Sequence, residues 1–314
     1  GHIRPGMFCV GGDSHSPTGG AFGAYMFGIG STEMLGVVVT GEIWLRVPHT
    51  LQMHWSGQLA PGVTAKDMML HMIGCFGMNG GQYQAVEFAG PAVQALGMQE
   101  RMTLSNMSAE LGAQAGLIAP DATTREWLRA AGVPDADLQG LDAWRTDEGA
   151  ALTRHTFDAT TLTPQVAAPH SPANAAPVAQ HAGQGIDVAY IGACTGAKLD
   201  DLRAAASVLR GKRVASGVRL MVAPASQQDQ AAAREEGVLQ VLQDAGAELF
   251  PTTCGACAGY GDTVGDNTTV ISSTARNFKG RMGSATAQVY LASPYTVAAS
   301  AVRGCITDPR EVLA

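Results

Sequence analysis

Apolar runs and helix-spaced segments alternate along the C-terminal part of the chain. The runs are short and rich in Val, Ile, Leu and Ala, which predicts buried strands. These predicted strands lie at residues 186–191, 218–224, 247–251, 269–273 and 289–293. The predicted helices span residues 199–211, 230–246 and 294–303, the last with Pro294 in its first turn. Strands that alternate with helices predict an α/β fold on a mostly parallel sheet.

The N-terminal part has a similar but less regular pattern. Its predicted strands lie at residues 7–11, 35–48 and 82–88. Its predicted helices lie at residues 21–34, 64–77 and 104–116, and a polar loop covers residues 12–20. Thr64 and Asp67 have the spacing of a capping box at the start of the second helix. Asn106 and Glu110 are four residues apart, so on the third helix they are predicted to share a face.

The segment 141–184 interrupts this pattern. It is rich in Pro, Ala, His and Thr, a composition that predicts a linker without a core of its own. The predicted divisions are therefore a first portion at 1–48, a second α/β unit at 49–140, the linker, and a third α/β domain at 185–314.

Composition narrows the classes of function. A net charge of −7 argues against a protein whose main partner is nucleic acid or an anionic membrane. No apolar run approaches the length of a membrane span, and the first residues have no secretory-signal pattern. The six cysteines form no dense disulfide framework, so we expect reduced thiols or metal ligands in a cytoplasmic environment.

Three of the cysteines follow predicted strands directly. Cys194 comes after the strand at 186–191, and Cys254 and Cys257 come after the strand at 247–251. Because ligand sites of parallel sheets lie beyond the carboxyl ends of the strands, these thiols are predicted to converge on one edge. Three thiolates can hold one metal centre. From spacing alone, a redox-active CxxC, half of a zinc site and buried structural cysteines remain alternatives.

Two further groups of residues are candidates for chemistry. Asp13, Ser14 and His15 lie on a loop after the first predicted strand, where a capping Asp and a surface His are the simpler interpretation. Arg276 and Arg281 lie in Gly-rich chain after the strand at 269–273. Guanidinium groups there suit an anionic substrate, although two solvated arginines would give the same pattern.

Five stretches together resemble the aconitase superfamily, and most closely the large subunit of 3-isopropylmalate dehydratase and its relatives. They are GDSHSPTGGAFGAYMFGIGSTEM, TLSNMSAELGAQAGLIAPDATT, IGACTGAKLDDLRAAA, TTCGACAGYG and SSTARNFKGRMG, in family order along the chain. The resemblance implies stacked three-layer αβα units with mostly parallel sheets, and residues 1–48 would be the remainder of the first such domain.

The resemblance also implies the chemistry of the site. Cys194, Cys254 and Cys257 would ligate a [4Fe–4S] cluster whose fourth iron binds the substrate hydroxyl and carboxylate. The reaction would be dehydration and rehydration of a hydroxy di- or tricarboxylic acid, with the iron as Lewis acid. The other implied site residues are Asp13, Ser14, His15 paired with Glu110, Asn106 near the cluster, and Arg276 and Arg281 on substrate carboxylate.

The chain departs from the family pattern in three places. Gly196 and Ala197 stand where the family has polar side chains after the first cysteine, and Ala275 stands where it has Asn. These changes remove hydrogen-bonding groups near the expected cluster. Family large subunits also begin well upstream of GDSH, so we expect a polypeptide shortened at its N-terminus. The serine base and further arginines are implied on a separate small subunit, the expected partner, without which the chain is not expected to turn over.

Several alternatives remain at this stage. Within the family, the substrate could be homoaconitate or a methylated malate, or the chain could be a catalytically impaired homologue that binds a cluster. An iron-sensing, RNA-binding descendant is a second class, disfavoured by the net charge of −7. A zinc-binding structural domain is a third.

Overall fold

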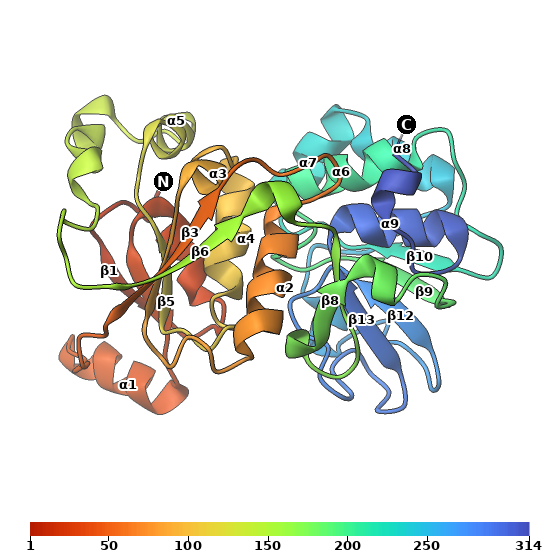
Figure 1. Ribbon diagram of the computed structural model, residues 1–314, viewed down its shortest axis with the longest axis horizontal. Coiled ribbons are helices and arrows are strands. Elements are labelled where there is room, and N and C mark those ends of the chain that lie inside the picture. Colours follow the sequence, from red (N-terminus) through yellow and green to blue (C-terminus); the bar gives the residue numbers. More distant parts are fainter. Residues whose placement is uncertain (314) are drawn as a thin grey trace. The chain divides into compact units, whose positions relative to one another are not determined.

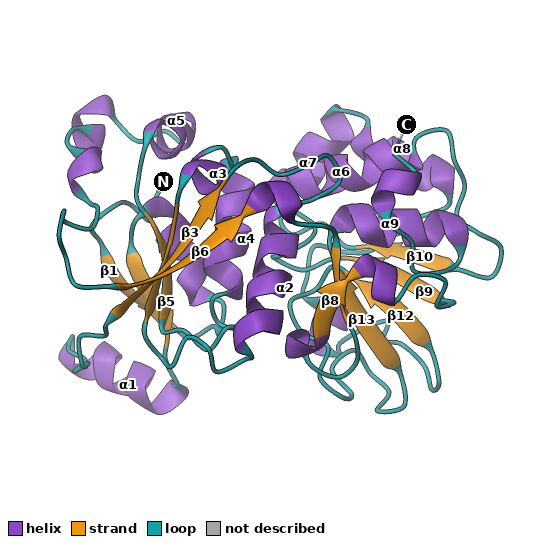
Figure 2. Ribbon diagram, in the orientation of Figure 1, coloured by secondary structure: helices purple, strands orange, loops and turns teal. Residues whose placement is uncertain are grey.

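The computed structural model describes residues 1–313, which form two compact units. Unit 1 comprises residues 1–58 and 78–160, and unit 2 comprises residues 59–77 and the chain from Thr161 onward. Helices and parallel strands alternate in both units, so the predicted α/β class with mostly parallel sheets is confirmed (Figure 2). No helix within residues 1–313 combines the length and apolarity needed to span a bilayer.

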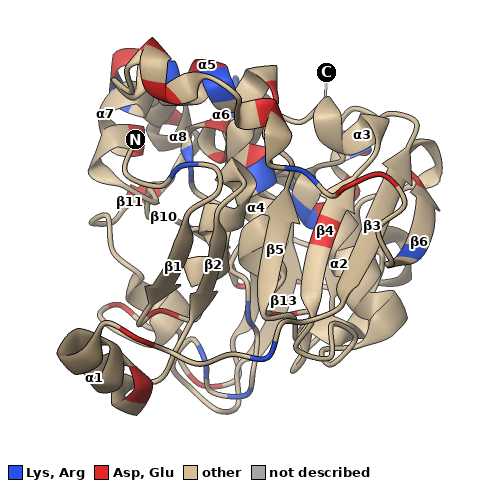
Figure 3. Cartoon of the chain, turned by 90° about the vertical axis from the view of Figure 1, so that its left-hand side faces the viewer, with Lys and Arg blue, Asp and Glu red and all other residues tan. Residues whose placement is uncertain are grey.

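Unit 1 contains a four-stranded parallel sheet in the order β5-β4-β3-β6 and a separate parallel pair, β1-β2. Figure 1 labels β1, β3, β5 and β6 of this unit. The strands are β1 (Phe8–Gly11), β2 (Tyr25–Gly28), β3 (Thr50–Ser56), β4 (Ala85–Ala89), β5 (Ala115–Ile118) and β6 (Thr153–Asp158). The helices are η1 (Ser16–Phe22), α1 (Ser31–Thr40), α3 (Pro91–Gln94), α4 (Met98–Met107), α5 (Ala122–Ala130), η2 (Asp135–Leu138), η3 (Leu141–Ala143) and η4 (Ala159–Thr161), which ends on the first residue of unit 2. Strands β1, β2 and β5 carry no charged residue (Figure 3).

Two predictions for the N-terminal part are wrong. Residues 21–34 form the end of η1, strand β2 and the start of α1, and residues 35–48 begin inside α1 rather than in a strand. Local caps decide the helix: the Glu33 carboxylate accepts the Gly30 N–H at 2.7 Å, and Gly41, with φ of +73°, ends the helix by donating to the Val37 carbonyl. These caps outweigh the β propensity of the valines.

Helix α4 is also displaced from the predicted helix at residues 104–116, since it begins at Met98. It ends at Met107, and a turn through Gly112, with φ of +79°, leads into β5. The Ser108 hydroxyl donates to the Ser105 carbonyl at 2.7 Å, a local bond that competes with continuation of the helix. Asn106 and Glu110 therefore do not share a helical face, which is a correction to the prediction.

Unit 2 is built on a seven-stranded sheet in the order β11-β10-β9-β12-β13-β7-β8. Its strands are β7 (Gln165–Ala167), β8 (Ala175–Pro177), β9 (Val188–Ile191), β10 (Arg219–Val222), β11 (Glu248–Leu249), β12 (Thr269–Ser272) and β13 (Gln288–Ala292). Its helices are α2 (Ala65–Phe76), η5 (Pro172–Asn174), η6 (Val178–Gln180), α6 (Leu199–Leu209), α7 (Gln227–Glu235), α8 (Val238–Ala245), η7 (Gly255–Ala258), α9 (Pro294–Arg303) and η8 (Pro309–Glu311). The strands from β9 to β13 are parallel, and β7 and β8 add antiparallel pairs at one edge.

Side-chain alternation gives this sheet two different faces. On one face Ile191 and Ile271 pack with α6, α8 and α9 in the larger core. On the other face Tyr190 and Val270 pack with Cys257 in a second cluster. One of the predicted metal-binding cysteines is therefore anchored against the sheet itself.

The remaining predicted elements agree with the structure except in two segments. The predicted helix at 230–246 is two helices, because Gly237 adopts φ of +74° between α7 and α8. The segment 141–184 is not a linker without a core: it supplies β6 to unit 1 and β7 and β8 to unit 2, and Val166 is fully buried. Its large apolar residues are few, and some of them, such as Val166, are buried where the segment pairs with a sheet.

The compact units do not follow the predicted divisions at residues 48, 140 and 184. Helix α2, which lies early in the chain, packs on β7 and β8 of unit 2. Its predicted capping box is confirmed, because Asp67 Oδ2 accepts the Thr64 N–H at 2.8 Å and the Thr64 hydroxyl at 2.9 Å.

Candidate active site

The candidate residues of unit 2 lie at the carboxyl edge of its sheet. The chain runs from β9 to β10 and β11 on one side and then returns to β12 on the other side of β9. Such a reversal is the switch point where ligands bind in open α/β sheets. Cys194 follows β9, Cys254 and Cys257 follow β11, and Arg276 follows β12. Each of these residues therefore follows the carboxyl end of a strand in the parallel part of one sheet.

The three cysteines differ in exposure. Cys194 is exposed and follows Ala193, which adopts an uncommon positive φ of +70° in the tight turn after β9. Cys254 is exposed at the start of η7, and Cys257 is buried within it. The Cys257 N–H donates to the Cys254 carbonyl at 2.9 Å, so one short turn fixes their spacing.

Electrostatics connect the three thiols. Burial raises the pKa of the Cys257 thiol to about 11, and negative charge on Cys194 or Cys254 raises this pKa further. The positive charges of Arg281 and Lys66 oppose the rise. The charges of Cys194, Cys254, Arg281 and Lys66 therefore all influence the Cys257 thiol. A buried thiolate at this position needs a compensating positive charge.

The donor set suits an iron–sulfur cluster. As the side chains stand in residues 1–313, no three His, Cys, Asp or Glu residues form a group that could hold a metal ion. Three soft thiolate donors without a fourth Cys or His favour a cluster over a structural zinc site. The buried Arg281 Nε also has no hydrogen-bond partner within the described chain, as expected of a donor reserved for a bound anion.

The candidate residues of unit 1 lie on the loop after β1. The Asp13 side chain accepts the His15 N–H at 2.7 Å, and its backbone carbonyl accepts the Ser16 hydroxyl at 2.8 Å. Ser14 is exposed on the same turn. A Cβ at Gly28 would come within 3.0 Å of the Asp13 carbonyl, so glycine there lets the two segments approach closely.

This loop is joined to the end of α4. His15 Nε2 lies 3.0 Å from Glu110 Oε1, and Glu110 is only 1% exposed. Asn106 is equally buried and donates from Nδ2 to the Thr18 hydroxyl at 2.8 Å. The structure thus brings His15, Asn106 and Glu110 together within unit 1, including the His15–Glu110 pair that the resemblance implied.

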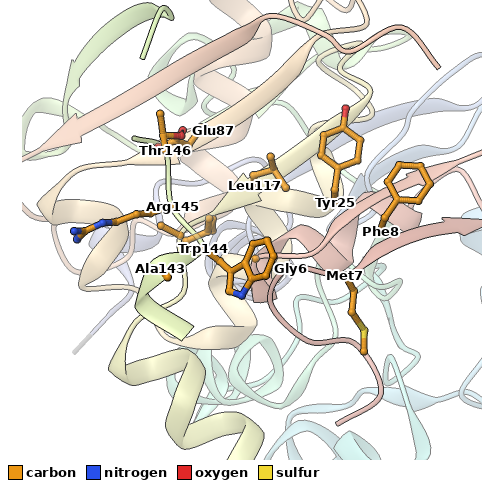
Figure 4. A pocket seen from close by; sticks show the side chains of 13 residues that line it. Gly6, Met7, Phe8, Tyr25, Glu87, Leu117, Ala143, Trp144, Arg145 and Thr146 are labelled. Carbon is orange, nitrogen blue, oxygen red and sulfur yellow. The ribbon is translucent and has the colours of Figure 1, made fainter. Parts of the chain in front are cut away.

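Unit 1 also contains a cavity of about 330 Å³ away from these residues. Its lining includes Phe8, Tyr25 and Trp144, and the Trp144 indole lies over the backbone of Gly6 (Figure 4). None of the predicted site residues lines this cavity.

Two polar side chains beside the cysteine loops escaped the sequence prediction. The Ser273 hydroxyl accepts the Gly192 N–H at 3.0 Å and donates to the Gly196 carbonyl at the same distance. Lys66 is 1% exposed and donates to carbonyls in the loop after β12. A Ser in a strand-end run and a Lys in a helix have no pattern that marks them, because their partners lie far along the chain.

The family model for the Aconitase family (aconitate hydratase) matches residues 1–185 and 179–304. The 3-isopropylmalate dehydratase large subunit 1 of Methanopyrus kandleri is 42% identical over 314 residues, covering 100% of this chain and 74% of that protein. The 3-isopropylmalate dehydratase large subunit of Nitratidesulfovibrio vulgaris is 43% identical over 311 residues, covering 98% of this chain and 73% of that protein. Among solved structures, aconitase X of Thermococcus kodakaraensis in its holo-form matches with a TM-score of 0.51 at 14% identity, over 87% of this chain and 63% of that one.

Proposed function

This chain belongs to the aconitase family of hydro-lyases, and from that premise we propose that it is the large subunit of a [4Fe–4S]-dependent hydro-lyase. Its substrate is a hydroxy di- or tricarboxylic acid, 3-isopropylmalate or a closely similar acid. The observation that carries the proposal is the convergence of three cysteines and Arg276 on the switch point of one parallel sheet.

In this proposal Cys194, Cys254 and Cys257 hold the cluster. When bound, the cluster supplies a Lewis-acidic iron that polarises the substrate hydroxyl. Arg281 binds a substrate carboxylate, since its buried Nε has no hydrogen-bond partner within the described chain. Arg276, in the loop that leaves β12, supplies a second guanidinium for the same purpose.

Unit 1 contributes acid–base chemistry. The buried Glu110 carboxylate orients the His15 ring and stabilises a proton at Nε2, the atom 3.0 Å from it. The Asp13 side chain accepts the backbone N–H of His15, and this bond fixes the backbone of the residue that carries the ring. Such a pair can donate or accept the proton that moves with the hydroxyl group.

The partner is a small subunit that completes the enzyme, as the words "large subunit" in the names of the relatives suggest. The test is to express this chain with its small subunit and reconstitute the complex anaerobically with ferrous iron and sulfide. It is then assayed on 3-isopropylmalate, homocitrate and 2-methylmalate by the ultraviolet absorbance of the unsaturated product.

Fastest dehydration of 3-isopropylmalate supports the proposed substrate, and a preference for another acid on the panel replaces it. Loss of activity in Arg281→Met with retained iron supports the carboxylate role. A cluster-loaded complex that dehydrates none of the acids contradicts the proposed reaction.

A further inference from the structure

Tyr190 has a buried hydroxyl group to which the proposed reaction gives no role. The residue lies in β9 and is 1% exposed, and its hydroxyl proton has no acceptor within residues 1–313. The backbone N–H of Cys257 acts on the hydroxyl oxygen, but an N–H group is itself a donor and cannot accept that proton. Burying a polar group without a hydrogen bond costs free energy, so such a hydroxyl points to an acceptor that binds beside it.

The Tyr190 ring lies over the start of the first cysteine turn. Gly192 follows two residues later in the chain, so its side-chain position falls on the same side as the ring. A Cβ built at Gly192 would lie under 3.0 Å from two ring carbons and from the hydroxyl oxygen, and glycine is therefore needed there to make room for the ring. The hydroxyl group thus points towards the carboxyl end of β9, where Cys194 lies.

The turn that carries the other two cysteines reaches the same hydroxyl group. A Cβ built at Gly255, in that turn, would lie 3.8 Å from the Tyr190 hydroxyl oxygen. Tyr190 also packs with Ala193 and Cys257 in one buried group of side chains. One phenol oxygen is therefore close to both loops from which the three thiols project.

An iron–sulfur cluster would supply the acceptor. A tyrosine hydroxyl is protonated at neutral pH and can donate one hydrogen bond. The sulfur atoms of a cluster carry negative charge, and hydrogen bonds to them are among the factors that set its reduction potential. The bond becomes stronger when the cluster gains an electron, because a charged acceptor binds a donor more strongly than a less charged one.

We propose that the Tyr190 hydroxyl donates a hydrogen bond to the cluster that Cys194, Cys254 and Cys257 would hold, and that this bond raises the reduction potential of the cluster. The inference rests on the proposed function, because the cluster is the acceptor. It gives the buried hydroxyl a partner and adds the end of β9 to the groups that tune the centre.

The test compares the whole wild-type chain with Tyr190→Phe. This substitution removes one oxygen atom and keeps the ring, so the packing against both cysteine loops is retained. The matched control is Tyr290→Phe, because Tyr290 lies in β13 of the same sheet and packs against the core on the opposite face.

The first measurement is urea unfolding of the cluster-free chains, followed by far-ultraviolet circular dichroism. Without a cluster, the wild-type hydroxyl is buried with no acceptor for its proton. Tyr190→Phe removes this cost, so its folded-to-unfolded ratio at a fixed urea concentration should rise about fivefold.

The second measurement uses the same chains after anaerobic reconstitution with ferrous iron and sulfide. Iron and sulfide content are determined, and the reduction potential is obtained from a redox titration followed by electron paramagnetic resonance. Loss of the hydrogen bond disfavours the more negative, reduced cluster, so Tyr190→Phe should lower the reduced-to-oxidised ratio at a fixed potential about fivefold. For a one-electron couple this is a reduction potential about 40 mV lower. Tyr290→Phe should keep the wild-type potential.

The outcomes separate the two proposals. Wild-type iron content with wild-type potential in Tyr190→Phe overturns the role of Tyr190 and leaves the proposed function intact. An equal shift in Tyr290→Phe also overturns that role, because the effect is then not specific to this hydroxyl. A cluster-free Tyr190→Phe chain that is less stable than the wild type overturns it too, because the hydroxyl then has its partner within the chain. A wild-type chain that takes up no iron or sulfide overturns the proposed function itself, before any variant is compared.

Discussion

Replacing Gly196 by alanine tests how tightly the first cysteine loop is packed. Gly196 stands two residues after Cys194, and its φ lies outside the left-handed region, so alanine meets no backbone obstacle there. The added Cβ would lie below 3.0 Å from three atoms of Ser273: its Cβ, its hydroxyl oxygen and its backbone carbonyl. Ser273 is fully buried and cannot swing away.

The magnitude follows from these contacts. Overpacking a close-packed interior by one methyl group costs about 1–3 kcal/mol. Displacing the Ser273 hydroxyl also weakens its bonds to Gly192 and Gly196, each worth about 0.5–1.5 kcal/mol. We expect Gly196→Ala to lower the free energy of unfolding of unit 2 by about 2–4 kcal/mol.

Urea unfolding measures this change. All four tryptophans lie in unit 1, so their fluorescence reports unit 1 alone, while far-ultraviolet circular dichroism follows both units. The control is Gly185→Ala in unit 2, where an added Cβ meets nothing within 4 Å. That change should stay within about 0.5 kcal/mol. The packing argument is refuted if Gly196→Ala unfolds at the wild-type urea concentration, or if both substitutions destabilise equally.

Three further predictions concern titration, ion pairing and acid–base chemistry. Burial raises the pKa of Asp67 to about 6 from its ordinary 3.8. Between these two pH values the folded protein binds more protons than the unfolded chain. The free energy of unfolding therefore falls by about 3 kcal/mol as the pH rises through this range. Urea titrations from pH 4 to 7 should lose this contribution in Asp67→Asn, and an unchanged slope would contradict it. Arg101→Met should destabilise unit 1 by about 3 kcal/mol, because the Arg101 side chain is fully buried and paired with a carboxylate. The control is Arg129→Met, which removes an exposed ion pair and should change stability by less than about 1 kcal/mol. Tryptophan fluorescence during unfolding checks both values, and equal effects would rule out the difference in burial as the cause. Glu110→Gln should lower turnover about 10²–10⁴-fold with iron content unchanged, because an amide stabilises a proton on His15 less than a carboxylate does; full activity would exclude the pair from the chemistry.

The positions of strands β9 to β13 along the chain could be predicted because each of these strands carries its own local pattern. Residues 186–191 and 269–273 read as strands from their apolar runs alone, and both contain observed strands. The place of Cys194 after the first of them follows from the general geometry of parallel sheets. These predictions needed no knowledge of distant contacts.

The failures lie where local preference and final structure differ. The valines of α1 have strand propensity, but two caps at Gly30 and Gly41 hold them in a helix. The segment 141–184 has few large apolar residues, yet one of them, Val166, is buried in the strand that pairs with β13. The composition of a segment does not show which neighbouring strand will bury its apolar side chains.

The residues of the candidate site also include some that local sequence patterns could not predict. The contact between His15 and Glu110 was implied by resemblance and could not be derived from spacing, because 95 residues separate them and the predicted helix around Glu110 does not exist. Lys66 was missed entirely, since its carbonyl acceptor on Ser273 lies 207 residues away. Long-range polar contacts leave no periodic trace in a sequence.

The central claim is that Cys194, Cys254 and Cys257 together hold an iron–sulfur cluster. The most direct measurement is iron and acid-labile sulfide content after anaerobic reconstitution of the wild-type chain and of each cysteine-to-serine variant. Cys75→Ser is the control, because Cys75 is an exposed thiol on α2. The account predicts a brown, cluster-loaded wild type and control, and loss of iron and sulfide in each of the three variants. Wild-type iron and sulfide content in any one of the three would contradict it.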